Sequence, residues 1–254
     1  MEKFNINGLS LTYDRRGKGT PLMLIHGFPL DHTTWNETAV LLEDTFDLIM
    51  PDLRGFGQST TINEAYTIDD MASDIAGLLD HLGIERAAIV GHSMGGYVAL
   101  AFARLYPTHV RGLGLVSSQA LADSPERKQG RYDMAAKVGG NGVGVVADAM
   151  APKLSADARV QDFVRDLIKR QSPAGVMGAL KAMAEREDST SLLALLKFAI
   201  VILHGDADEL IPVDRSREMK AAIMHAEFVE LKGIGHMPMM EDAKRTAEIL
   251  RLLK

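Results

Sequence analysis

Short apolar runs separated by helical patterns constrain the fold of this chain more than any other feature of its sequence. Strands buried on both faces of a parallel sheet appear as continuous apolar runs of this kind, whereas strands with one face in water alternate apolar and polar residues. Because helical patterns lie between the runs, we predict an α/β fold with a mostly parallel central sheet and flanking helices. The runs are Leu22–Ile25, Phe46–Met50, Ala87–Val90, Leu113–Val116 and Ile200–Leu203.

Two local patterns add detail to this prediction. Residues 67–83 carry apolar residues with the 3.6-residue period of a helix. A threonine–aspartate capping signal predicts where this helix begins, and a glycine predicts where it ends. Residues 3–14 alternate instead, and this alternation predicts an antiparallel hairpin that turns near Asn7 and Gly8.

One long segment interrupts the alternation of strands and helices. Residues 120–196 contain no convincing strand pattern but show helical stretches at 157–170, 173–185 and 190–197. A glycine-rich run at 139–144 follows no predicted strand, so we interpret it as a flexible joint between helices and not as a phosphate-binding loop. We therefore divide the chain into a core made of residues 1–119 and 197–254, and a helical cap made of residues 120–196.

A candidate nucleophile follows the third apolar run. Gly91-His92-Ser93-Met94-Gly95 has the form G-x-S-x-G and lies between a predicted strand and a predicted helix, which is the context in which this motif holds a reactive serine. The glycines permit a turn tight enough to expose the hydroxyl of Ser93 above the sheet. The backbone N–H of Met94, at the start of the helix, then points at the reacting centre.

A second backbone donor is expected after the first apolar run. The strand ending at Ile25 leads into His26-Gly27-Phe28-Pro29, where the chain turns back. The N–H of Phe28 can then face the same point as that of Met94, and two converging donors make an oxyanion hole. We expect His26 to brace this loop without titrating in catalysis.

The candidates for base and acid lie further along the chain. His236 follows the predicted strand 226–231 on a short loop, whereas the other seven histidines lie in turn motifs or helical patterns. Asp206 and Asp208 both follow the run ending at Leu203. We expect Asp206 to close the turn through its own backbone and Asp208 to orient the imidazole of His236.

Five motifs together carry a resemblance to a known family. They are H-G-F-P (26–29), P-D-L-R-G-F-G-Q-S (51–59), G-H-S-M-G-G (91–96), H-G-D-A-D-E-L-I-P (204–212) and G-I-G-H (233–236). Their identity and order resemble the α/β-hydrolase superfamily over essentially the whole chain. The resemblance implies the α/β-hydrolase fold with a variable helical cap, the chain order serine, acid, histidine, and Asp208 as the acid of the triad.

The serine at the turn favours acyl chemistry through an acyl-enzyme. Dehalogenases and epoxide hydrolases of the superfamily have aspartate there, so Ser93 argues against both. The sequence resembles small carboxylesterases, which implies hydrolysis of short to medium acyl esters. It also resembles cofactor-free haloperoxidases, for which Pro29 could reshape the oxyanion loop to favour peroxide over water, although we prefer the interpretation that Pro29 only stiffens this loop. Enol-lactonases and carbon–carbon bond hydrolases share the same triad and remain alternatives. A binding protein without catalysis is the remaining alternative, although such proteins often lose a member of the triad.

The amino-acid composition argues against several classes of binding partner. The net charge is −6 without a long basic run, which argues against nucleic acid or an anionic membrane, and the absence of cysteine excludes disulfides and a thiolate nucleophile. No metal-ligand spacing or cofactor motif accompanies the triad, so we expect neither a metal nor a cofactor. A polar N-terminus without a long apolar run predicts a cytoplasmic protein. We expect a small-molecule acyl substrate and leave the oligomeric state open.

The cap is rich in aliphatic and methionine side chains with few aromatic ones, which suits a pliable pocket for short acyl chains. We select Met134, Val143 and Met177 as residues that line this pocket. The alternative is that these side chains form the core of the cap itself.

Overall fold

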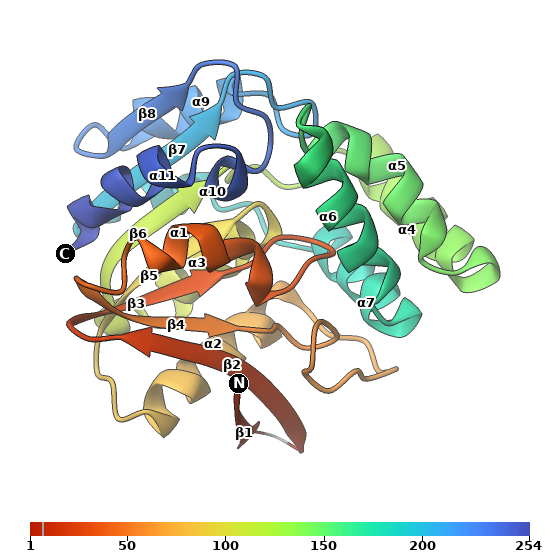
Figure 1. The fold of residues 1–254 in the computed structure, drawn as a ribbon, viewed down its shortest axis with the longest axis horizontal. Coiled ribbons are helices and arrows are strands. Elements are labelled where there is room, and N and C mark those ends of the chain that lie inside the picture. The colour runs from red at the N-terminus through yellow and green to blue at the C-terminus, as the bar shows by residue number, and fades with distance from the viewer. Residues whose placement is uncertain (7) are drawn as a thin grey trace.

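The computed structural model describes residues 1–6 and 8–254 and places an eight-stranded sheet at the centre of the molecule (Figure 1). The strand order is β1-β2-β4-β3-β5-β6-β7-β8. Neighbours from β4 to β8 pair in parallel, and the first two pairs, β1-β2 and β2-β4, are antiparallel. This arrangement confirms the predicted fold class. The strands are β1 (Glu2–Ile6), β2 (Leu9–Gly17), β3 (Thr20–Ile25), β4 (Phe46–Pro51), β5 (Ala87–His92), β6 (Val110–Val116), β7 (Ala199–Gly205) and β8 (Glu227–Leu231).

Each predicted apolar run lies in a strand of this sheet, because both faces of the central strands are covered. The side chains of β5, for example, are all buried. The N-terminal hairpin is also present, since β1 pairs with β2 from Ile6 and Leu9 outward. Its predicted turn at Asn7 lies outside the described residues.

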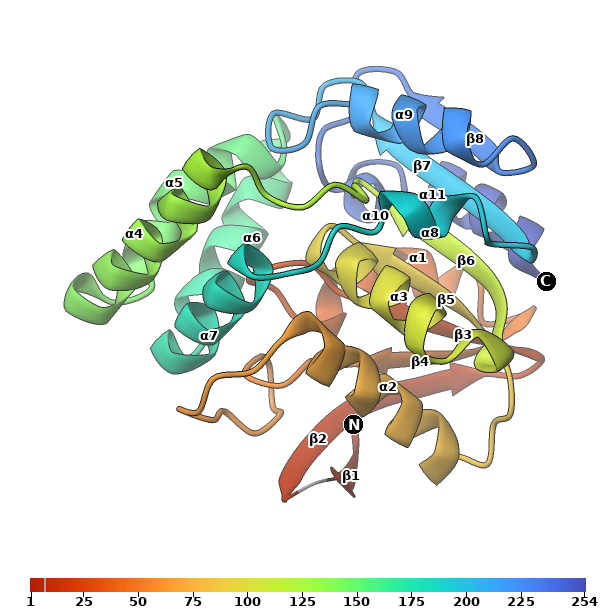
Figure 2. The same cartoon turned by 180° about the vertical axis from the view of Figure 1, so that it is seen from behind.

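Helices cover both faces of the sheet. In Figure 1, α1 (Asn36–Val40) and α11 (Ala243–Leu250) lie across the face toward the viewer. Figure 2 shows α2 (Ile68–His81), α3 (Met94–Leu105) and α9 (Asp214–Ala222) across the opposite face. The predicted start of α2 is confirmed, because Thr67 and Asp70 form a reciprocal capping box. The short helix α10 (Pro238–Glu241) precedes α11.

Between β6 and β7 the described chain forms helices and loops but no strand. The helices α4 (Pro125–Asn141), α5 (Gly144–Leu154), α6 (Ala158–Lys169) and α7 (Pro173–Ala184) project together beyond one end of the sheet (Figures 1 and 2). The last helix, α8 (Thr190–Leu193), lies apart from them and packs against α9. No part of the described chain forms a helix long and apolar enough to cross a membrane.

The glycine-rich run differs from its predicted role as a joint. Gly139 and Gly140 belong to the last turn of α4, and Gly144 is the first residue of α5. Only Gly142, with φ of 76°, supplies a turn between the helices. The reason is that α4 begins with a strong capping pair, Ser124 and Pro125, and continues through the glycines until the left-handed residue ends it.

A close backbone contact joins the helices α4–α7 to the core. A Cβ atom on Gly175 of α7 would lie only 1.9 Å from the carbonyl oxygen of Gly55, in the loop after β4. The hydroxyl of Tyr66 also donates a hydrogen bond of 3.0 Å to the carbonyl of Gly175. Because neither partner in the close contact has a side chain, α7 can rest directly on the core backbone.

We predict opposite effects for alanine at two glycines of these helices. Gly175→Ala should destabilise the protein by about 1–3 kcal/mol, because backbone must move to admit the methyl group. Gly140→Ala, where a Cβ meets no atom within 4 Å, should leave stability unchanged or raise it by up to about 1 kcal/mol. Chemical denaturation of both variants measures the difference, and equal stability would contradict the proposed contact.

Candidate active site

The serine of the G-x-S-x-G motif lies in a strained turn between β5 and α3. Ser93 has φ of 52° and ψ of −114°, a conformation that few non-glycine residues adopt. A Cβ on Gly91 would lie 2.0 Å from the carbonyl oxygen of Gly95, and a Cβ on Gly95 would lie 2.5 Å from that of Ile25. The glycines of the motif are therefore required by backbone packing, and they bring the turn against the end of β3.

Hydrogen bonds from the last residue of β6 and from the loop that follows it hold the same turn. The backbone N–H of Ser93 donates to the carbonyl of Val116 at 2.9 Å, and the hydroxyl of Ser118 donates to the carbonyl of Ser93 at 2.9 Å. A Cβ on Gly96 would lie 2.2 Å from that hydroxyl oxygen, so this glycine makes room for the second bond. The turn is thus supported on both sides without using the hydroxyl of Ser93.

His236 and Asp208 form a buried pair. The Nδ1 atom of His236 lies 2.6 Å from Oδ2 of Asp208, and both side chains are almost fully buried. The other carboxylate oxygen accepts the backbone N–H groups of Leu210 at 2.8 Å and Ile211 at 3.0 Å. Because Nδ1 faces a carboxylate, it carries the hydrogen, and Nε2 is left as a proton acceptor.

The surroundings of Asp208 keep it ionised. Burial acts to raise the pKa of Asp208, but the charge of His236 and hydrogen bonds from His204, His236 and the backbone of Ile211 outweigh it. The net effect holds the pKa far below the ordinary value of an aspartate. This carboxylate therefore stays charged at neutral and mildly acidic pH, which suits a group that orients a histidine and stabilises its cationic form.

His204 is a contact of Asp208 that the sequence did not reveal. Its Nε2 atom lies 3.0 Å from Oδ2 of Asp208 and 2.9 Å from the carbonyl oxygen of Ile211. Both neighbours are acceptors, so Nε2 carries the hydrogen and Nδ1 accepts from the hydroxyl of Ser216, 2.6 Å away. His204 thus donates to the same carboxylate oxygen as His236. The spacing of four residues between His204 and Asp208 is the only signal that the sequence offered.

His92 links the nucleophile turn to the loop of the base. Its Nε2 atom lies 2.8 Å from the carbonyl oxygen of His236, and the two ring centroids are 4.9 Å apart. Burial, followed by the charge of His236, lowers the pKa of His92 well below the ordinary value, so its ring is neutral. The residue directly before Ser93 is therefore bonded to the backbone of the candidate base.

Asp206, the rival candidate for the acid, braces a different part of the loop. Its Oδ1 atom accepts the backbone N–H of Gly233 at 2.6 Å, three residues before His236, and its side chain is exposed. The sequence predicted that Asp206 would close its own turn. It instead joins the turn after β7 to the loop after β8, because the two strands end side by side.

The loop after β3 carries the first predicted oxyanion donor. The Nδ1 atom of His26 donates to the carbonyl of Gly27 at 2.8 Å, and its Nε2 accepts the N–H of Leu53 at 3.0 Å. Burial lowers the pKa of His26, which favours the neutral ring that these bonds require. Phe28 follows on this loop, and Met94 is the first residue of α3, whose N–H has no partner within the helix.

A nearby polar cluster belongs to the loop framework. Single ligand atoms of Asp31, His32 and Asp52 lie within 4.8 Å of one another, a spacing compatible with a metal ion. The carboxylate of Asp52 is already used, because each oxygen accepts two hydrogen bonds, one pair from His32 and the other from Thr12 and Gln58. These contacts account for the cluster as a brace between β2, β4 and the oxyanion loop.

A pocket of about 330 Å³ opens at Ser93 between the core and the helices α4–α7. Ser93, Phe28 and Tyr97 line it from the core, and Leu210 and Ile211 line it from the loop that carries Asp208. The helices α4, α5 and α7 contribute Arg127, Gly130, Arg131, Met134, Val146, Met150, Leu180 and Met183. The candidate nucleophile, the loop of the candidate acid and the helices α4, α5 and α7 therefore meet at one cavity.

The three selected cap residues are not all at this cavity. Met134 lines it, as expected. Met177 instead lines a separate pocket together with Tyr66 and Lys181, and Val143, buried before the first residue of α5, is absent from the lining at Ser93. For Met177 and Val143 the selection is corrected. Met177 lies on α7, which packs against α4, and its side chain borders the other pocket, whereas Val143 is buried in the turn between α4 and α5.

Comparison with known proteins shows the family. Residues 20–243 match the model of the alpha/beta hydrolase fold, and the chain belongs to this family. An AB hydrolase superfamily protein of Bacillus subtilis (strain 168) is 30% identical to this chain. The aligned region covers 92% of this chain and 91% of the Bacillus subtilis protein. The dihydrolipoyllysine-residue acetyltransferase component of the acetoin cleaving system of Pseudomonas putida is 31% identical over 96% of this chain, which spans 66% of the length of that protein.

Two solved structures are similar over nearly their whole length. A thermophilic esterase from Thermogutta terrifontis, solved with malate bound, superposes with a TM-score of 0.95 at 38% identity, covering 99% of this chain and 97% of its own. The enol-lactonase from Burkholderia xenovorans LB400 superposes with a TM-score of 0.91 at 25% identity, covering 99% of both chains. Together with the family match, these similarities identify the chain as a hydrolase.

We predict that the two aspartates of the loop after β7 differ sharply in their effect on activity. Asp208→Asn should lower kcat on the order of 10⁴-fold, because an amide can no longer hold the hydrogen of His236 on Nδ1. Asp206→Asn should have a much smaller effect, because it only weakens a surface bond to Gly233. Steady-state kinetics of the two variants side by side checks this, and a larger loss at Asp206 would exchange their roles.

The pH profile should contain a single acid-side transition. The depressed pKa of Asp208 means that this carboxylate stays charged as the pH falls, so only protonation of His236 removes activity. The value of kcat/KM should therefore rise with pH as the imidazole becomes neutral. A rate that is independent of pH between about 5 and 8 would contradict this assignment.

Proposed function

We propose that this protein is a serine hydrolase that cleaves carboxylic esters of small molecules through an acyl-enzyme on Ser93. One observation carries the proposal: the pair of His236 and an ionised, buried Asp208 lies beside a pocket that also exposes the strained Ser93. Burying a carboxylate costs desolvation free energy, and here the buried carboxylate orients an imidazole at the edge of a pocket, which is the arrangement that a general base requires.

The chemistry follows from these positions. The hydroxyl of Ser93 attacks the ester carbonyl while Nε2 of His236 accepts its proton, and the backbone N–H groups of Phe28 and Met94 stabilise the oxyanion. The tetrahedral intermediate expels the alcohol, which takes the proton from His236. A water molecule, deprotonated by the same imidazole, then attacks the acyl-enzyme and releases the acid.

The comparisons support ester chemistry at the level of the class. The esterase from Thermogutta terrifontis is 38% identical over almost the whole chain, and an enol-lactonase acts on a lactone, which is an internal ester. A bromoperoxidase from Bacillus anthracis, at 24% identity, supports the fold alone. We therefore favour ester hydrolysis over perhydrolysis and carbon–carbon cleavage, with a lactone as a cyclic variant of the same substrate.

The pocket suits short to medium acyl groups. Its volume of about 330 Å³ accommodates a small ester, and Met134, Val146, Met150, Leu180 and Met183 give it a mainly aliphatic wall. We propose that these cap side chains contact the acyl chain. A series of p-nitrophenyl esters of increasing acyl length, with peroxide and lactone assays alongside, defines the range.

Ser93→Ala should lower kcat on p-nitrophenyl butyrate by several orders of magnitude without loss of fold, because the hydroxyl supplies chemistry and not packing. Ser117→Ala is the matched control: like Ser93, Ser117 is a serine with positive φ, but it is fully buried and does not line the pocket. The Ser117→Ala variant should hydrolyse p-nitrophenyl butyrate with a kcat close to that of the wild-type protein. More than about a tenth of wild-type activity in Ser93→Ala would refute the proposal.

A fluorophosphonate probe separates an enzyme from a binding protein of the same fold. An activated Ser93 should be labelled in the wild-type protein and in Ser117→Ala, and not in Ser93→Ala. Labelling requires an activated hydroxyl, so an unlabelled wild-type protein would indicate that the pocket only binds its ligand.

A further inference from the structure

Three arginines share one carboxylate at the cap side of the pocket. Asp123, whose side chain is fully buried, contacts Arg131, Arg186 at 2.8 Å and Arg127 at 3.6 Å. Burial acts to raise the pKa of Asp123, but the arginines outweigh it and hold the pKa below its ordinary value. Across residues 1–6 and 8–254, no other carboxylate lies within 4.0 Å of these three guanidinium groups. Two positive charges are therefore uncompensated, in a protein whose net charge is −6.

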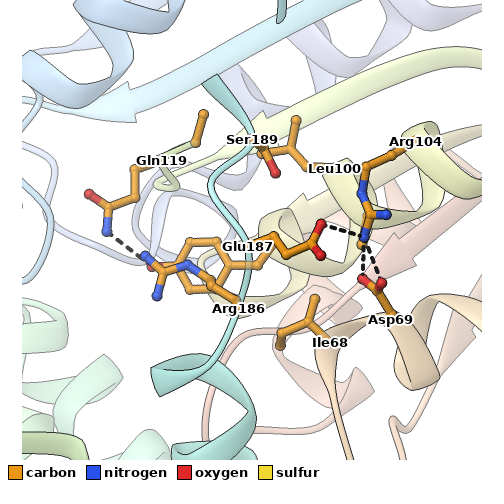
Figure 3. Close-up of a pocket in the computed structure, with 11 residues that line it drawn as sticks. Ile68, Asp69, Leu100, Arg104, Gln119, Arg186, Glu187 and Ser189 are labelled. Atoms are coloured by element: carbon orange, nitrogen blue, oxygen red, sulfur yellow. Dashed lines mark hydrogen bonds and ion pairs between the residues drawn. The ribbon is translucent and has the colours of Figure 1, made fainter. Parts of the chain in front are cut away.

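The inner arginine of this cluster is structural. Arg186 donates to the carbonyls of Met183 at 2.8 Å and Leu121 at 2.6 Å, and its guanidinium lies 4.1 Å from the centroid of the Tyr97 ring. Figure 3 shows Arg186 beside Gln119 at a small pocket that lies next to the active-site cavity. These contacts hold the guanidinium of Arg186 in one position, where it also contacts Asp123, so Arg186 fixes Asp123 in place.

The other two arginines line the active-site pocket itself. Arg127 and Arg131 lie one helical turn apart on α4, and both border the cavity that contains Ser93. One nitrogen of Arg127 donates to the carbonyl of Leu210 at 3.3 Å, and one of Arg131 contacts the sulfur of Met183 at 3.3 Å. A guanidinium has five N–H donors, so both retain donors for a ligand.

We propose that the substrate of this site carries a carboxylate at the end remote from the scissile ester, as in a half-ester of a short dicarboxylic acid or a lactone with a carboxylate side chain. This inference rests on the proposed function. The reacting carbonyl lies at Ser93 on the core side, and the carboxylate binds Arg127 and Arg131 on the cap side. Guanidinium groups bind carboxylates in a fork geometry, and the aliphatic wall between the two ends strengthens the attraction by excluding water.

The experiment compares two esters of equal length that differ in charge. Monomethyl glutarate carries a terminal carboxylate, and methyl 5-oxohexanoate replaces that carboxylate with a neutral methyl ketone. In a pH-stat assay the wild-type protein should favour the charged ester by about tenfold or more in kcat/KM, mainly through KM. The preference should shrink as the salt concentration rises, because the attraction is electrostatic.

Two neighbouring residues on α4 provide matched variants. Arg127→Gln should lower kcat/KM for monomethyl glutarate by about tenfold and leave the neutral ester nearly unchanged. Lys128→Gln removes the same charge one residue further along, but Lys128 pairs with Glu185 and does not line the pocket, so neither ester should be affected. Arg131→Lys keeps the charge beside Asp123 and should retain part of the preference.

The outcomes separate this inference from the proposed function. Equal or better hydrolysis of the neutral ester by the wild-type protein would overturn the inference, as would equal effects of Arg127→Gln and Lys128→Gln. If p-nitrophenyl butyrate is still cleaved in a Ser93-dependent reaction, the proposed function survives that result. If Ser93→Ala retains cleavage of p-nitrophenyl butyrate, the proposed function itself fails.

Discussion

The turn at Ser93 holds a non-glycine residue at φ of 52°, and the other parts of the site are arranged around this turn. Such a conformation costs of order 1–3 kcal/mol and persists only where its surroundings enforce it. The glycines at positions 91 and 95 do so by letting α3 approach the backbone at the ends of β5 and β3. The same close approach brings the loop of Phe28 beside Ser93. One backbone constraint therefore places the nucleophile and both expected oxyanion donors, and His92 extends it to the loop of the base.

The buried charges follow two different arrangements. At the core end of the pocket, the single carboxylate of Asp208 is shared by His236 and His204 and by two backbone N–H groups, so the anion is well satisfied and stays ionised. At the cap end, Asp123 is shared by three arginines, and positive charge is left over. The pocket between these ends is mainly aliphatic. In our proposal the first arrangement supplies the chemistry of ester cleavage, and the second selects the substrate.

The core of the fold and the candidate triad could be predicted from the sequence because each has a local signal. Strands buried on both faces are continuous apolar runs, and Ser93, Asp208 and His236 lie in short motifs at strand ends. The sequence could not show His92 and His204 as partners of these residues, because their contacts depend on side-chain direction across neighbouring strands. The structure of the cap was the hardest part to predict from the sequence. Helix α4 mixes charged, small and apolar residues without a clear period, so its extent through Gly140 and the arginines it presents to the pocket were missed, and Met177 was assigned to the wrong cavity.

The central claim is that a covalent acyl group passes through Ser93. Rapid-quench mass spectrometry during turnover of p-nitrophenyl butyrate tests it most directly. The intact protein should gain the mass of one butyryl group within the first turnover, and peptide mapping should place that group on Ser93. Asp208→Asn should form the adduct more slowly, because His236 is no longer held in the required tautomer. Product release without any adduct, or an adduct on another residue, would contradict the claim.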